Sequence, residues 1–467
     1  MLQNISSWGT SGSLLATADA AETGPFILTA VLLSLIAVYL VSKLGGELSK
    51  RLDLPPVLGE LVGGVVVGVS ALHFLVFPET GATASDSMLM TLLQSFSNLD
   101  STAIAHVFET QSEAISILAE LGVIILLFEI GLESDLRELS KVGYQAAIVA
   151  VVGVAAPFIL GTVGLVAFFH APVIPAVFAG AALTATSIGI TSKVLSELGH
   201  LKSTEGQIIV GAAVIDDVLG IIVLAVVASL AKTGEVDLLN VVYLIASASG
   251  FLLGAIFLGK FFNQSFVAIA DKLQTRGALL IPAFTFALIM AVVANLIHLE
   301  AILGAFAAGL VLDETDKRKE LDQQVAPIAD ILVPIFFVTV GAKADLGVLN
   351  PTVAENRAGL IIAAFLIVVA IVGKVVTGWA VFGQSGVNRL AIGVGMIPRG
   401  EVGLVFAGIG SASGVLDKPL EAAIIVMVIL TTFLAPPLLQ LALNDSEEDS
   451  ADLKDLTPSV ETVPIKD

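Results

Sequence analysis

The sequence predicts an all-α polytopic membrane protein of about thirteen transmembrane helices, with inverted repeats and two crossed broken helices. Hydrophobic residues make up 56% of the 467, and the mean hydropathy is +0.97, well above that of soluble domains. The apolar runs are continuous and about 20 residues long, which is the length of a membrane-spanning helix. They lack the ten-residue alternation of a transmembrane barrel. Two of the runs carry polar or helix-breaking residues in corresponding places.

Thirteen hydrophobic segments follow one another along the chain, and each is expected to cross the bilayer once. The ninth is the shortest. They lie near residues 26–46, 57–78, 114–132, 143–169, 176–198, 206–231, 239–259, 277–298, 300–313, 327–344, 358–383, 390–411 and 419–442.

The distribution of basic residues predicts the orientation of these segments. Sixteen of the 22 Lys and Arg residues fall on one side of the alternating loops or in the C-terminal tail, four fall on the other side, and two lie inside spans. The positive-inside rule places the larger group in the cytoplasm. The N-terminus is then outside and the C-terminus inside, as an odd number of crossings requires.

Composition also excludes several classes of function. The chain has no cysteine, so disulfides, thiol catalysis and thiolate metal sites are excluded. The net charge of -20 argues against nucleic acid as a partner. Residues 1–25 have no Lys or Arg, unlike a signal peptide, and are expected to be extracytoplasmic. The acidic stretch 443–467 is expected to form a disordered cytoplasmic tail, and the segment 78–113 a polar loop with some helix.

Two adjacent carboxylates, Asp216 and Asp217, lie in the middle of the apolar run 207–230. An ionised carboxylate at that depth costs about 3 kcal/mol or more, so the pair must face protein, water or an ion. The favoured interpretation is a cation or proton site, and the alternative is a structural ion pair. Neighbouring helical residues point about 100° apart, so one of the two can pair with a basic residue while the other faces the ion.

The fifth and twelfth segments are the best candidates for broken helices. Residues 183–191 read LTATSIGIT, whose hydroxyls can satisfy backbone groups where a helix unwinds. Residues 393–403 read GVGMIPRGEVG, whose proline removes a helix hydrogen bond. Each broken segment is the middle member of a triplet, and the two triplets run in opposite directions. Paired interruptions in inverted halves point to a transport site at the midplane.

Three further charges lie in these spans. Lys374 is mid-span, where pairing with Asp216 is favoured over snorkelling to the interface. For Arg399 and Glu401, direct transport and structural neutralisation of the broken helix both stay open. Glu120 and Glu129 in the third segment are candidates for lining a path.

Several stretches, taken together and in order, resemble the cation:proton antiporter superfamily, in its prokaryotic (possibly cyanobacterial) sodium/proton and potassium/proton branch. The resemblance covers residues 55 to 437. Its motifs are LPPVLGELVGGVVVG, ELGVIILLFEIGLESDL, LTATSIGIT, VIDDVLG, GAFAAGLVL, PIFFVTVGAKADL, the span that holds Lys374, and PRGEVGLVF.

The resemblance implies a membrane domain over residues 26–442 that works by an elevator-like movement. A core domain would comprise spans within 143–231 and 358–442. A scaffold that forms a homodimer would comprise spans within 26–132 and 277–344, and residues 239–259 would link the two. The membrane would be that of a prokaryotic cell, or the thylakoid for a cyanobacterial member. Potassium efflux systems of this superfamily have a cytosolic nucleotide-binding domain after the membrane part, and no such sequence follows here.

The resemblance also assigns roles to residues. Asp217 falls on the ion-carrying aspartate, and Thr186 on the unwound segment whose backbone or hydroxyl helps to coordinate Na⁺ or K⁺. We also expect the adjacent Ser187 to belong to the ion- and proton-binding site, with Asp216. Asp216 falls where electrogenic members pair an aspartate with a lysine, here Lys374. Arg399 and Glu401 depart from the simplest sodium/proton members and are assigned as supporting charges.

The expected function is exchange of a monovalent cation, Na⁺ before K⁺, for protons in pH homeostasis, without cofactor or enzymatic activity. One carboxylate that holds either a proton or a cation is sufficient for such exchange. A channel or a sodium-coupled symporter of similar architecture is the alternative. An intramembrane aspartic protease is disfavoured, because its two carboxylates must converge from different helices and share a proton, whereas Asp216 and Asp217 lie on one helix.

Overall fold

We describe a computed structural model of the chain, over residues 11–97, 99–233, 237–270, 272–352, 354–383 and 386–455. Within these residues the regular structure is helical throughout, without a strand. Eight helices are long and apolar enough to cross a membrane, and shorter apolar helices lie between them. The predicted fold class is therefore confirmed. The count of thirteen crossings stays a prediction, because five of the predicted spans correspond to short or interrupted helices.

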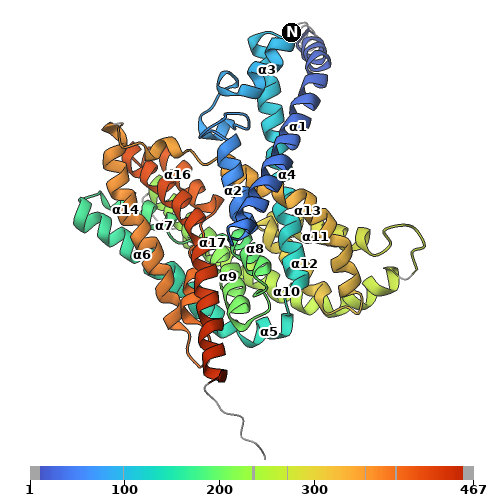
Figure 1. Cartoon of the computed structure of the whole chain (residues 1–467), viewed down its shortest axis with the longest axis vertical. Coiled ribbons are helices and arrows are strands. Elements are labelled where there is room, and N and C mark those ends of the chain that lie inside the picture. Colours follow the sequence, from blue (N-terminus) through green and yellow to red (C-terminus); the bar gives the residue numbers. More distant parts are fainter. Residues whose placement is uncertain are drawn as a thin grey trace, which may run out of the picture.

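One group of helices forms the right-hand and upper part of Figure 1. In this group α4 packs on α12 and α13, α2 packs on α1 and α13, and α11 packs on α12. The group comprises α1 (Ser11–Arg51), α2 (Pro56–Val67), α4 (Ser101–Glu133), α11 (Leu280–Leu296), α12 (Ala301–Asp313) and α13 (Arg318–Ala342). We call it the scaffold group.

Glycines let the backbones of the scaffold helices touch. A Cβ on Gly59 of α2 would lie 2.0 Å from the carbonyl oxygen of Gly45 on α1, and a Cβ on Gly309 of α12 would lie 2.3 Å from that of Phe128 on α4. Neither separation is compatible with a side chain. The sequence therefore fixes these helix pairs at backbone contact, as small residues do in membrane bundles.

The second group, which we call the crossing group, lies on the left of Figure 1. Here α14 packs on α17 and α6, α6 packs on α7 and α9, and α16 packs on α7 and α17. The group comprises α6 (Gly143–Phe169), α7 (Val173–Ala182), α9 (Thr204–Thr233), α14 (Ala354–Val375), α15 (Arg389–Gly395), α16 (Glu401–Ala412) and α17 (Lys418–Asp455).

Three elements connect the two groups. The helix α8 (Ile188–Glu197) contacts α9 and α17 of the crossing group and α4 and α2 of the scaffold group. The helix α10 (Leu238–Ala270) contacts both α9 and α12, and the short α5 (Leu136–Lys141) contacts α6, α9 and α12. The division of the chain into a core and a dimer domain stays a prediction.

The polar segment 78–113 contains α3 (Met88–Phe96) and the beginning of α4. Asp100 caps α4 by accepting a 2.8 Å hydrogen bond from the amide of Ala103. That hydrogen bond lowers the pKa of the exposed Asp100 carboxyl. The third predicted span, 114–132, is thus the inner part of a longer helix. At the other end of the chain, α17 continues to Asp455. The expected disorder of 443–467 is therefore wrong for its first part, and residues 456–467 lie outside the described ranges.

Candidate functional site

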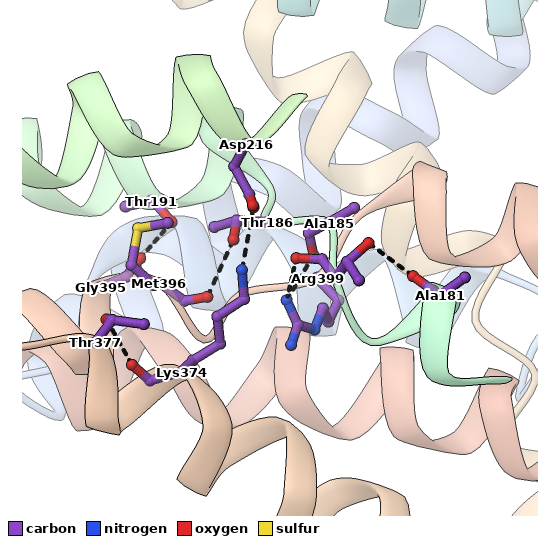
Figure 2. A network of polar contacts seen from close by, with 11 residues as sticks. Ala181, Ala185, Thr186, Thr191, Asp216, Lys374, Thr377, Gly395, Met396 and Arg399 are labelled. Carbon is purple, nitrogen blue, oxygen red and sulfur yellow. Dashed lines mark hydrogen bonds and ion pairs between the residues drawn. The ribbon is translucent and has the colours of Figure 1, made fainter. Parts of the chain in front are cut away.

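Two interrupted helices meet at the centre of the crossing group. The first is broken between α7 and α8 at residues 183–187, and the second between α15 and α16 at residues 396–400. Donors of the first interrupted helix form three hydrogen bonds with carbonyls of the second. The Ser187 amide donates to the Pro398 carbonyl at 2.8 Å, the Thr186 hydroxyl to that of Met396 at 3.2 Å, and the Thr191 hydroxyl to that of Gly395 at 3.0 Å. Figure 2 shows the two hydroxyl contacts.

The residue types explain why the helices break here. Pro398 has no amide hydrogen to donate to a helix hydrogen bond. The Thr184 hydroxyl donates to the Ala181 carbonyl at 2.8 Å and so competes with the backbone amides for that acceptor. Gly400 allows the segments to approach, since a Cβ there would lie 3.0 Å from the Ser187 hydroxyl oxygen. The Gly395, Met396 and Pro398 carbonyls at the second break thus accept hydrogen bonds from the first interrupted helix, as a membrane interior demands.

Asp216 and Lys374 form a buried ion pair beside the crossing. The Lys374 Nζ atom donates to the Asp216 Oδ2 atom at 3.1 Å, and both side chains are 0% exposed. Gly153 on α6 provides the space, because a Cβ there would lie 3.3 Å from Nζ. The other oxygen of Asp216, Oδ1, has no hydrogen-bond partner in the described structure. Lys374 lies in the last turn of α14, where a positive charge is favourable at the negative end of the helix.

Arg399 lies in the second break and is fully buried. Its Nη1 atom donates to the Ala185 carbonyl at 2.6 Å and more weakly to that of Thr184 at 3.4 Å (Figure 2). Its own carbonyl accepts from the Thr432 hydroxyl at 2.7 Å. The guanidinium thus neutralises carbonyls just beyond the C-terminal end of α7, where a cation is favourable. It is also within electrostatic reach of Asp216.

Asp217 lines a small cavity that neither Asp216 nor Lys374 lines. The side chain is 8% exposed and lines a cavity of about 10 Å³ together with Thr186 and Ser187. That is the space of roughly one water molecule. Carboxylate and hydroxyl oxygens are the ligands that hard cations prefer. The arrangement can therefore hold one small, largely dehydrated cation, or a proton on the carboxylate.

A second, larger cavity of about 230 Å³ adjoins this one and lies between the two helix groups. Glu120 on α4 and Thr339 on α13 line one wall, and residues of α16 and α17 line the other, so we call it the Glu120 cavity. Val123, Phe336 and Gly400 line both cavities and form the layer that separates them.

The opposite side of Asp217 is closed by polar contacts between α8 and the scaffold group. Glu197 accepts a 3.2 Å hydrogen bond from the Val57 amide of α2, and the Ser196 hydroxyl donates to Glu133 of α4 at 3.3 Å. The site thus has a cavity on one side, and on the other side α8 is joined to the scaffold group by these two hydrogen bonds.

Of the predicted site residues, the structure brings together Asp216, Lys374 and Arg399 in one cluster, and Asp217, Thr186 and Ser187 in one cavity. Glu401 is the first residue of α16, and its side chain lies outside the described part of the chain. Glu129 does not line either cavity.

Sequence reasoning missed the residues that the scaffold group contributes to the Asp217 cavity. Glu300, which precedes α12, and Phe336 both line it. The family motif PIFFVTVGAKADL contains Phe336, but an apolar side chain in an apolar span carries no signal of its own. Glu300 stands at the boundary of two spans, where a carboxylate is ordinarily solvated.

Comparison with known proteins gives one family and several close relatives. Residues 31–444 match the family described as sodium/hydrogen exchanger, transmembrane. The chain is 60% identical to the high-affinity Na⁺/H⁺ antiporter NhaS3 of Synechocystis sp., over 94% of this chain and 95% of that protein. It is 33% identical to the Na⁺/H⁺-K⁺ antiporter GerN of Bacillus cereus, over 87% and 94% of the two chains.

Among solved structures, the sodium proton antiporter MjNhaP1 of Methanocaldococcus jannaschii at pH 8 has a similar fold. The TM-score is 0.57 at 17% sequence identity, over 91% of this chain and 99% of that one. At this identity the likeness concerns the fold alone.

Proposed function

The chain belongs to the sodium/hydrogen exchanger family, and from this premise we propose that it exchanges Na⁺ for H⁺ across its membrane at Asp217. It is a multi-pass integral membrane protein whose relatives are transporters rather than enzymes. The Synechocystis relative, named as a high-affinity Na⁺/H⁺ antiporter, supports Na⁺ as the cation. The name of GerN includes K⁺ as well, so K⁺ is the second ion to test.

The observation that carries the proposal is the Asp217 cavity. A carboxylate, two hydroxyls and the backbone of a helix break surround a space of roughly one water molecule. Glu300, which precedes α12, lines the same space. Of the two carboxylates we assign the exchange to Asp217, which binds either a cation or a proton because both compete for the same charge. A cation must therefore leave the site before a proton can bind, and a proton must leave before a cation can bind. This alternation is the requirement for exchange. Asp216 is occupied by Lys374 and takes the supporting role.

Movement of the crossing group against the scaffold group supplies access to the two sides. The Glu120 cavity gives ions access to the layer of residues above Asp217. On the opposite side, the contacts of Glu197 and Ser196 with the scaffold group block access to Asp217. An elevator-like shift of α8 would break those two contacts and close the cavity. In the predicted orientation the open side is the extracytoplasmic one. Pairing of two scaffold groups in a homodimer, in a bacterial cell or thylakoid membrane, completes the proposal.

Proteoliposomes test the exchange itself. Protein is reconstituted with a pH gradient, and dissipation is followed after addition of Na⁺, K⁺ or Li⁺. We expect Na⁺-dependent dissipation from the wild type and none from Asp217→Asn, because the amide cannot cycle a proton. Asp316→Asn, in an exposed loop, is the matched control and should exchange normally. Normal exchange by Asp217→Asn would remove Asp217 from the site, and flux without proton coupling would indicate a channel.

Cross-linking of introduced cysteines tests the movement. Because the chain has no native cysteine, the reagent reacts only with the introduced pair. Val57→Cys with Glu197→Cys, joined by a short bis-thiol reagent, ties α8 to α2 and should stop exchange. Ser42→Cys with Glu60→Cys ties α1 to α2 within the scaffold group, where the native side chains lie 2.9 Å apart, and should leave exchange intact. Undiminished exchange by the first pair after full cross-linking would rule out a shift of α8 against α2.

A further inference from the structure

We propose that Glu120, with the hydroxyls of Ser116 and Thr339, forms a second cation site in the Glu120 cavity. It takes a partly hydrated monovalent cation before that cation reaches Asp217. The inference rests on the proposed exchange at Asp217 and deepens it, because it assigns the step that precedes binding there. Four observations carry it: the position of Glu120, an unsatisfied buried hydroxyl, the charge balance of the cavity and its size.

Glu120 lies directly above the Asp217 cavity. It precedes Val123 on α4 by three residues, and Val123 lines both cavities. Three residues rise about 4.5 Å along a helix, so the carboxylate is one turn from the separating layer. Ser116 is one turn further along the same face, since residues four apart on a helix are neighbours. All three side chains line the Glu120 cavity.

Thr339 supplies the second, independent indication of a ligand. It is 4% exposed and lines the same cavity from α13, three residues from Phe336. Its hydroxyl oxygen has no hydrogen-bond partner in the described structure, and the Ser116 hydroxyl also has none. The hydroxyl of a threonine in a helix ordinarily donates a hydrogen bond to the carbonyl one turn earlier, as that of Thr431 does to Met427. The Thr339 and Ser116 oxygens are both buried and their residues line the cavity, so a rotation about χ1 would present each unsatisfied hydroxyl to a ligand.

The charges around the cavity select a cation. Three charged residues line it: Glu79, Glu120 and Lys343. Lys343 forms an ion pair with Glu79 and lies over the ring of Phe77, 4.8 Å from its centroid. The charges of Lys343 and Glu79 therefore compensate each other. The net charge that remains in the cavity is the negative charge of Glu120. Hydroxyl and carboxylate oxygens are hard ligands, which suit Na⁺ or K⁺.

Size distinguishes the two sites. The Glu120 cavity, about 230 Å³, has space for a cation with several waters of roughly 30 Å³ each. The Asp217 cavity, about 10 Å³, does not. A cation therefore sheds most of its water as it passes the layer of Val123 and Phe336. A site that concentrates cations just outside that layer raises the rate at which they cross it.

Binding of ²²Na⁺ to purified protein tests the site without transport. Total salt is held constant with choline chloride. Asp217→Asn should keep a weak saturable site, and Asp217→Asn/Glu120→Gln should lose it. Asp217→Asn/Glu113→Gln is the matched control, because Glu113 is exposed on the same helix but does not line the cavity. It should bind as Asp217→Asn does. Thr339→Val in the Asp217→Asn background should weaken the binding.

Transport kinetics provide the second arm. In the otherwise native protein, Glu120→Gln should raise the KM for Na⁺ roughly fivefold, as loss of a unit charge near a water-filled path predicts, with the maximal rate unchanged. Glu113→Gln should leave KM unchanged. Absence of the weak site in Asp217→Asn, or an equal effect of Glu113→Gln, would overturn the proposal. Failure of the wild type to exchange would instead refute the proposed function, and the ²²Na⁺ arm would still decide this site.

Discussion

Breaking the ion pair between Asp216 and Lys374 should destabilise the fold strongly. Lys374→Met removes the cation while keeping a side chain of similar length. Asp216 is 0% exposed, and its Oδ1 atom already lacks a partner, so the variant leaves a buried carboxylate without its hydrogen-bonded cation. Removal of one member of such a pair costs about 3–5 kcal/mol. Asp216→Leu should cost more than Lys374→Met, because it leaves both Lys374 and Arg399 uncompensated.

The double variant Asp216→Leu/Lys374→Met should recover part of the loss, since two apolar side chains of similar volume often replace a buried pair at little cost. The recovery is incomplete because Arg399 still lacks the charge of Asp216. The free energy of unfolding is measured by circular dichroism in detergent mixtures of increasing SDS content. The control is Lys343→Met, which breaks the partly exposed pair with Glu79 and should cost at most about 1 kcal/mol. If the effects of the two single substitutions add to within about 0.5 kcal/mol, the pair does not interact and the reasoning is wrong.

Three further outcomes follow from the site and the packing. If proton and cation share Asp217, the KM for Na⁺ in proteoliposomes should fall about tenfold per pH unit while the site is mostly protonated and then level off at higher pH. A KM that is flat from about pH 6 to 9 would mean separate sites. Gly59→Ala should lose at least about 1–3 kcal/mol of stability by overpacking, whereas Gly250→Ala, with nothing within 4 Å, should be neutral in the same unfolding assay. Thr191→Val should cost about 1–3 kcal/mol by leaving the buried Gly395 carbonyl unpaired, and an unchanged unfolding curve would show that this bond is dispensable.

The parts of the fold that were predictable are those with a strong local signal. Continuous apolar runs predicted the helices. A hydroxyl-rich stretch around Thr186 and a proline-containing stretch around Pro398 predicted the two interruptions. The opposite charges of Asp216 and Lys374 in separate apolar spans suggested their contact, since each needs a partner there. The structure places the two side chains 3.1 Å apart.

The remaining features depend on tertiary packing, which one sequence does not encode locally. The hydrogen bonds that join the two interrupted helices connect residues about two hundred positions apart, and no pattern specifies which donor meets which carbonyl. The place of Glu120 in a cavity depends on how α4 faces α17. The helical start of the acidic tail was missed because its composition resembles that of solvated segments.

The mutual support of the two breaks has a consequence for biosynthesis. The Ala185 carbonyl of the first break and its partner Arg399 are 214 residues apart in the chain. At about 5–20 residues per second, a ribosome needs roughly 10–40 s to add that length. Throughout this interval the first break has left the ribosome without the segment that satisfies its backbone. Its exposed carbonyls are costly in lipid, so we expect α7 and α8 to stay within the insertion machinery or at the aqueous boundary until α15 and α16 emerge. Insertion of this protein is then a late, long-range event rather than a helix-by-helix one.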